Sequence, residues 1–216
     1  MSYPCSCGCR LEELAVFLDG STYGQHKGQG VQHLSKTGLV SVWFKRDPGS
    51  QTLNPKTHNP IADQMIFETY TTNDPSTGEP LVSLSSRSDG TVRIAGRFGG
   101  APEEQNGGCN CVLSGISGPT QVGLWHHVLV AWDNAKGYLE MYVDDQRQAL
   151  EGVTQHDVAV VWDEAFYSFG ARHGRYVFLG CLAELYLSRG FLDITLESSR
   201  RMFSSAGAAG LSLIHI

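Results

Sequence analysis

The sequence predicts an all-β fold, an antiparallel sandwich of two packed sheets with one short helix near the C-terminus. Short segments rich in β-branched and aromatic residues recur along the chain, and clusters of glycine, proline, asparagine and aspartate separate them. The chain has 216 residues, of which 41% are hydrophobic and 25 are glycine, so it can bury one sizeable core. Together these observations favour a single sandwich or barrel of short strands.

The strands expected in the first half of the chain share this composition and end at turn-forming residues. They are LEELAVF (11–17), LVSVWFKR (39–46), QMIFETYT (64–71), LVSLSSR (81–87) and TVRIAGR (91–97). Two long polar connections, at 47–63 and 99–108, interrupt the pattern. Loops of this kind often carry binding residues when a rigid scaffold positions them.

One helix is expected late in the chain, over TLESSRRMF (195–203). Thr195 is the expected N-cap, because a threonine hydroxyl can accept a hydrogen bond from a backbone N–H of the first turn. Glu197 lies in the first turn and Arg200 and Arg201 come late, in agreement with the helix dipole.

The stretch GLWHHVLVAWDNAKGYLEMYVDDQ (123–146) holds two adjacent histidines and several acids, which raises the question of a catalytic or metal site. Successive side chains of a strand point to opposite faces, so His126 and His127 cannot both reach one metal ion or substrate atom. The turn-forming DNAKG (133–137) follows, and then a second alternating segment. The pattern indicates a core β-hairpin, and it favours structural roles for the histidines over a catalytic role.

Composition argues against two kinds of partner. The formal net charge is −6 and the lysines and arginines are scattered, so no basic stripe is present that could neutralise a run of phosphates. The longest apolar runs, VLVAW and VAVVW, are too short to span a bilayer. We therefore expect no nucleic acid partner, no membrane insertion and no signal peptide.

The hairpin WHHVLVAWDNAKGYLEMYVDD resembles that of laminin-G-like domains in the concanavalin A-like lectin/glucanase superfamily. GLVSVWFKRD, MIFETY and FLGCLAELYLSRGFLD are similar to other strands of that family and fall in the same order. The segment LDITLESSRRMFSSAG is similar to single-domain versions in bacteriophage and prophage structural proteins. The resemblance covers about residues 38–206. Asp145 stands where the family commonly has a turn glycine, so a different turn geometry is expected there.

The resemblance implies a jelly roll with a curved face that relatives use for glycans or proteins. We expect a non-catalytic recognition or assembly module, with a glycan, a protein surface, a homo-oligomer or virion subunits as partners. The similarity of the late segment implies a virion protein that folds in the cytoplasm before assembly. Its role there would be capsid decoration, a tail part or host adhesion.

The alternative is a glucanase-like glycoside hydrolase, whose chemistry needs two carboxylates on one strand face. The sequence holds no Glu-x-Asp or Asp-x-Glu pair. Glu140 and Asp144 are four residues apart, but Asp144 is expected at a turn, and Glu184 is an isolated acid on a strand. The carboxylate pattern therefore favours a binding module over an enzyme.

Candidate ligand residues are few. Trp162 and Tyr167 form an aromatic pair that could stack on a sugar face, although core packing is favoured for aromatics at strand spacing. Calcium is the cofactor considered first, with Asp19, Asp74 and Asp89 as ligands at loop ends. A turn role, in which each aspartate bonds its own backbone, is favoured for all three.

The cysteines form two tight clusters. Cys5, Cys7 and Cys9 lie in CSCGC, and Cys109 and Cys111 lie in CNC. If the N-terminal tail meets the second loop, these five thiols could form a zinc or disulfide clip. Because Cys-x-Cys is tighter than usual zinc spacing, free thiols or an occasional disulfide are favoured over a metal site. Cys181 lies within a strand-like segment and is expected to be a buried small hydrophobe.

We divide the chain into a Cys-rich tail (1–10), a laminin-G-like sandwich (11–206) and a C-terminal tail (207–216). The last tail ends in LSLIHI, which resembles a read-through of sequencing adapter. The alternative is a real terminal strand, and we assign no function to residues 207–216.

Overall fold

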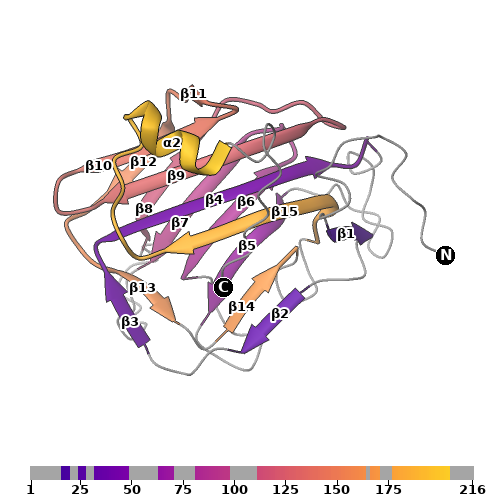
Figure 1. Cartoon of the computed structure of the whole chain (residues 1–216). Coiled ribbons are helices and arrows are strands. Elements are labelled where there is room, and N and C mark those ends of the chain that lie inside the picture. Colours follow the sequence, from indigo (N-terminus) through magenta and orange to yellow (C-terminus); the bar gives the residue numbers. More distant parts are fainter. Residues whose placement is uncertain are drawn as a thin grey trace.

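The computed structural model describes residues 16–19, 24–27, 32–48, 63–70, 81–97, 111–163, 166–170 and 177–204. Within these residues, strands form two large sheets and one small sheet, and a helix lies over β9 and β10 (Figure 1). The expected fold class, an all-β antiparallel sandwich with one short C-terminal helix, is confirmed. The small sheet is a feature that the sequence analysis did not predict.

The strand order follows from the pairings, and every described pair is antiparallel. The six-stranded sheet has the order β1 (Val16–Asp19), β15 (Leu179–Ser188), β4 (Thr37–Arg46), β9 (Trp125–Asp133), β10 (Tyr138–Val143) and β11 (Gln146–Arg147). The seven-stranded sheet has the order β12 (Glu151–Gln155), β8 (Cys111–Ile116), β7 (Val92–Arg97), β6 (Val82–Arg87), β5 (Asp63–Tyr70), β14 (Phe166–Phe169) and β2 (Gly24–Lys27). The small sheet pairs β13 (Val160–Asp163) with β3 (Gln32–Ser35), and the helix is α2 (Glu197–Ser204).

The expected strands agree with β4 to β7 within a few residues at each end. The first expected strand agrees in its last two residues with β1, and residues 11–15 lie outside the described part of the chain. The two expected polar connections fall almost wholly outside the described residues, as do both expected tails.

Alternation along the central strands builds the core between the two large sheets. On β4 and β9, one set of alternate residues is fully buried in the main core cluster: Val40, Val42, Phe44, Val128, Val130 and Trp132. The opposite face of these strands packs in a second cluster, which contains Leu39, Leu129, Ala131, Tyr142 and Ile194. The expected core hairpin is confirmed, because both faces of β9 are buried as its two-sided apolar pattern predicts.

Trp132 is the largest fully buried side chain, and its position depends on a glycine. Gly38 is paired with Trp132 across β4 and β9, and a Cβ atom on Gly38 would lie 2.1 Å from Cζ2 of the indole. The indole therefore lies directly over the glycine backbone. It stacks on Trp162 of β13, with ring centroids 5.6 Å apart and an interplanar angle of 5°. This stack joins the six-stranded sheet to the small sheet.

Arg200 attaches α2 to the outer face of the six-stranded sheet. Its guanidinium forms an ion pair with Asp145, lies 4.4 Å from the centroid of the Tyr142 ring, and donates to the carbonyls of Ile194 and Thr195 at 3.0 and 2.8 Å. Glu197 lies in the first turn and Arg201 in the last, as expected.

The expected N-cap is wrong. The helix begins at Glu197, and the Thr195 hydroxyl donates to Asp193 at 2.6 Å. The same Asp193 oxygen accepts from the Thr195 backbone N–H at 2.9 Å. Thr195 is therefore part of the turn that precedes the helix.

A two-residue turn, Asp144 and Asp145, joins β10 to β11. Both residues have positive φ, 51° and 62°, which is the combination that suits a type I′ hairpin turn. Asp145 itself adopts the left-handed conformation that glycine would favour, and the expected difference from the family's turn stays a prediction.

We predict that Gly38→Ala destabilises the protein by about 2–3 kcal/mol, because the added methyl group must displace Trp132 from its stack on Trp162. The melting temperature should fall by roughly 5–10 °C for a domain of this size. Thermal unfolding followed by circular dichroism measures the change.

Gly118→Ala is the matched control. The nearest atom that its Cβ would meet is Oε1 of the flexible Gln148 side chain, at 3.3 Å. Equal melting temperatures for the two variants would show that the space over Gly38 does not constrain Trp132.

Candidate functional site

The adjacent histidines lie on opposite faces of β9, as expected. His126 faces the main core, where its ring lies 5.8 Å from that of Phe44. His127 faces the outer side, where it stacks on Trp43 at 4.9 Å. The two rings therefore make separate contacts and do not form one site.

His126 links the end of β10 to the loop before β9. Its Nδ1 donates to Asp144 at 2.7 Å, and its Nε2 lies 2.9 Å from the carbonyl oxygen and 3.1 Å from the backbone nitrogen of Gln121. Burial opposes protonation, but the hydrogen bonds to Asp144 and Gln121 and the charge of Asp144 outweigh it and raise the pKa of His126. The other Asp144 carboxylate oxygen accepts from the His127 backbone N–H at 2.9 Å, so this aspartate has the expected structural role.

His127 and Ser41 have the spacing of a nucleophile and its base, with Oγ and Nε2 2.8 Å apart. Burial lowers the pKa of His127 to about 4, so the ring is neutral at physiological pH. The two side chains belong to residues that are only 3% and 4% exposed. A substrate cannot reach them in this fold, so the pair is structural.

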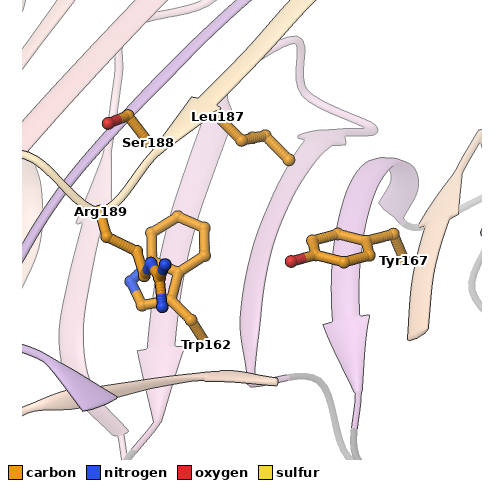
Figure 2. Close-up of a pocket in the computed structure, with 5 residues that line it drawn as sticks. All are labelled: Trp162, Tyr167, Leu187, Ser188 and Arg189. Carbon is orange, nitrogen blue, oxygen red and sulfur yellow. The ribbon is translucent and has the colours of Figure 1, made fainter. Parts of the chain in front are cut away.

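One pocket, with a volume of about 300 Å³, lies between β13, β14 and the end of β15. We call it the Trp162 pocket, and its described lining residues are Trp162, Tyr167, Leu187, Ser188 and Arg189. Figure 2 shows the Tyr167 hydroxyl pointing toward Trp162 and Arg189. The lining thus combines two aromatic rings, a hydroxyl on Ser188 and a guanidinium.

The aromatic residues of the pocket are held by the core behind them. Trp162 is stacked on Trp132, and Tyr167 is stacked on Phe67 with ring centroids 6.4 Å apart. Trp162 is only 3% exposed, so it offers a ligand a small part of its ring and no open stacking face. Tyr167 is half-buried and presents more of its side chain.

The polar end of the pocket is anchored through the backbone that follows β15. The carbonyl oxygen of Arg189 accepts from Thr37 Oγ1 at 2.6 Å and from Ser35 Oγ at 3.3 Å. Ser188 Oγ accepts from the Gly190 backbone N–H at 3.0 Å. These contacts fix the main chain from which the exposed Arg189 side chain extends.

Trp162 and Tyr167 were predicted as a ligand-binding pair, and the structure brings both to one pocket. The core packing that the sequence favoured for them is also present. Their contact with a ligand stays a prediction. The sequence analysis missed Leu187, Ser188 and Arg189, because no local pattern shows which strand ends converge.

Asp89 is the one calcium candidate whose side chain the structure describes. Asp89 lies in the β6–β7 turn, where one carboxylate oxygen accepts from the backbone N–H and the hydroxyl of Thr91 at 3.0 and 2.6 Å. The Thr91 hydroxyl and backbone N–H lower the pKa of Asp89, as the turn role predicts. Asp19 is the last residue of β1, and Asp74 lies outside the described residues. Among the described residues, no group of three or more His, Cys, Asp or Glu side chains could hold a metal ion.

Of the five clustered cysteines, Cys111 alone lies in the described part of the chain; Cys5, Cys7, Cys9 and Cys109 lie outside it. Cys111 begins β8, is half-buried, and its thiol donates to the Leu113 carbonyl at 3.1 Å. The zinc or disulfide clip stays a prediction. Cys181 is 4% exposed within β15, which confirms the expected burial.

The acids considered for hydrolysis have other contacts. Glu140 forms a bidentate ion pair with Arg147, and Asp144 binds the two histidines. Glu184 lies at an irregularity in β15 with φ of 51°, and burial raises its pKa. None of the five described residues that line the Trp162 pocket carries a carboxylate.

No helix in the described part of the chain is long and apolar enough to cross a membrane.

The sequence matches no protein-family model, and comparison with curated protein sequences gives no match. Among solved structures, the chain is similar to the native heptameric SAP-like pentraxin from Limulus polyphemus, with a TM-score of 0.55 and 11% identity over 90% of this chain and 82% of the pentraxin. It is similar to CBM40 of the Ruminococcus gnavus IT-sialidase bound to α2,3-sialyllactose, with a TM-score of 0.54 and 12% identity over 88% of this chain and 98% of CBM40. It is also similar to the binding domain of botulinum neurotoxin serotype G, with a TM-score of 0.52 and 11% identity over 89% of this chain and 42% of that one. At these identities the similarities show the fold alone, an antiparallel β-sandwich of the jelly-roll type.

We predict that the two histidines give opposite pH dependences to the free energy of unfolding. For His127, the unfolded state binds a proton near pH 6.5 and the folded state near pH 4, so stability falls as pH falls through this window by about 1.4 kcal/mol per pH unit, or about 3 kcal/mol in all. For His126, the folded pKa is raised, so its contribution is present below pH 6.5 and is lost as pH rises through the folded pKa.

Urea unfolding between pH 4 and 8 measures both effects, with His126→Gln and His127→Gln as each other's control. His127→Gln should flatten the loss of stability as pH falls below 6.5, and His126→Gln should remove the loss of stability that His126 causes as pH rises above 6.5. Equal slopes for the two variants would contradict the assignment of opposite signs.

Proposed function

We propose that the protein is a non-catalytic binding module that holds a saccharide in the Trp162 pocket. The observation that carries the proposal is the pocket itself, in which aromatic rings, a serine hydroxyl and a guanidinium line one recess of about 300 Å³. This volume is at the lower end of the range of about 300–1,000 Å³ that is typical of small-molecule sites, and it suits a short saccharide better than a long polymer face.

A saccharide suits this lining because a sugar ring has apolar C–H faces and a rim of hydroxyl groups. Tyr167 can pack against the C–H face, while Ser188 and Arg189 can bond the hydroxyl groups. CBM40, which has a similar fold, has a solved structure bound to sialyllactose, and this supports a binding role without locating a site in this chain.

Two other functions receive less support. A glycoside hydrolase needs two carboxylates beside the ligand, and the described pocket lining supplies none. An assembly module that binds protein through its sheet faces remains the second candidate. We also propose that the protein is related to laminin-G-like domains and is part of a virion. Both proposals are supported by the sequence resemblance alone.

We predict that a glycan array probed with the full chain shows saturable binding, and that Tyr167→Ala weakens it about tenfold because the ring contact is lost. Tyr167→Phe keeps the ring and should retain most of the affinity. The array is run with calcium and then with a chelator, because the predicted roles of Asp19 and Asp74 as calcium ligands stay open.

Leu124→Ala is the surface control, since Leu124 is exposed in the loop before β9 and does not line the pocket. Circular dichroism checks that each variant folds. If no glycan binds the wild type in either condition, the saccharide proposal fails and assembly becomes the better account. If Tyr167→Ala and Leu124→Ala bind equally, the pocket is the wrong site.

A further inference from the structure

Arg189 contributes a positive charge to the Trp162 pocket. It is the one charged side chain among the five described lining residues, and those residues include no acid. The chain as a whole carries a formal charge of −6, so the charge of Arg189 is opposite in sign to the net charge of the molecule. An exposed guanidinium at a recess of ligand size can attract an anionic ligand group.

The position of Arg189 allows such a contact to be specific. Its backbone carbonyl is held by Thr37 and Ser35, which lie at the bend between β3 and β4. The guanidinium is a planar fork whose parallel N–H groups match the two oxygens of a carboxylate. Because the Arg189 backbone is held in place and its guanidinium is exposed, this side chain can orient a ligand carboxylate beside Trp162 and Tyr167.

The apolar side chains beside Arg189 strengthen this charge-assisted hydrogen bond. Trp162 and Leu187 pack against the main core and supply apolar surface next to the guanidinium. Charge-assisted hydrogen bonds are stronger where apolar groups exclude part of the water. A neutral sugar hydroxyl can also accept from Arg189, but it gains less because it carries no charge.

We infer that the pocket selects an acidic saccharide, one whose sugar ring bears a carboxylate, and that Arg189 pairs with this carboxylate while Tyr167 contacts the ring. The inference rests on the proposed saccharide-binding function and adds the chemical class of the ligand. Uronic and sialic acids are the sugars that have this chemistry.

The test uses ligand pairs that differ in the acid alone: methyl β-glucuronide against methyl β-glucoside, and α2,3-sialyllactose against lactose. Isothermal titration calorimetry with the full chain should give at least tenfold tighter binding for the acidic member of one pair. Arg189→Gln should remove most of this difference, and Arg189→Lys should keep part of it, because an ammonium retains the charge and loses the fork.

Arg201→Gln is the matched control. It removes the same charge from the chain, and Arg201 lies on α2, paired with Glu197. This variant should keep the full preference for the acidic sugar. Circular dichroism of all variants checks the fold, which exposed substitutions should leave intact.

The outcomes separate this inference from the proposed function. Equal binding of acidic and neutral sugars overturns the inference and leaves saccharide binding in place, whereas no binding of any sugar overturns both. A preference that survives Arg189→Gln but not Arg201→Gln places the anion contact elsewhere and overturns the role of Arg189. Equal binding of a sulfated and a carboxylated sugar overturns the selectivity for carboxylate.

Discussion

The stack of Trp132 on Trp162 is the contact on which the layered structure depends. Gly38 leaves the space that Trp132 fills, and the stack holds β13 against the interior of the sandwich. Both indole nitrogens are buried without a hydrogen-bond partner among the described residues, which costs roughly 1–3 kcal/mol for each group. Burial of an aromatic side chain of about 150–250 Å² contributes roughly 4–6 kcal/mol, so the stack is favourable despite that cost.

The same packing prepares the Trp162 pocket. Trp162 and Tyr167 are fixed from behind by Trp132 and Phe67, and the carbonyl of Arg189 is fixed by hydroxyl groups of the β3–β4 bend. A ligand would therefore order few main-chain groups or rings when it binds, and preorganisation of this kind lowers the entropic cost of binding. The guanidinium is the part of the lining that is exposed and has long rotatable bonds. It can adapt to a ligand while the rest of the pocket stays in place.

The sequence predicts the features that depend on local patterns. Alternation predicted the hairpin of β9 and β10 and the opposite orientations of His126 and His127, because the period of a strand is two. The prediction of Thr195 as N-cap was wrong because its hydroxyl donates to Asp193, two residues upstream. The sequence does not show whether this hydroxyl bonds to a neighbouring side chain or to the first turn of the helix. The pocket could be predicted only in part. Trp162 is opposite His33 in the small sheet and Arg189 follows the pairing of β15 with β4, and such pairings between distant segments have no local signature.

The charge of the whole chain and the charge of the pocket act over different distances. A formal charge of −6 repels an acidic saccharide that approaches from far away, but at physiological ionic strength this repulsion is screened beyond about 8 Å. A carboxylate in the pocket would be in direct contact with Arg189, well inside that distance and next to apolar walls, where screening is weakest. The net charge therefore slows the encounter more than it weakens the complex, and selectivity for an acidic sugar is compatible with an acidic protein. Local lining, and not the overall charge of the chain, decides which saccharide the pocket retains.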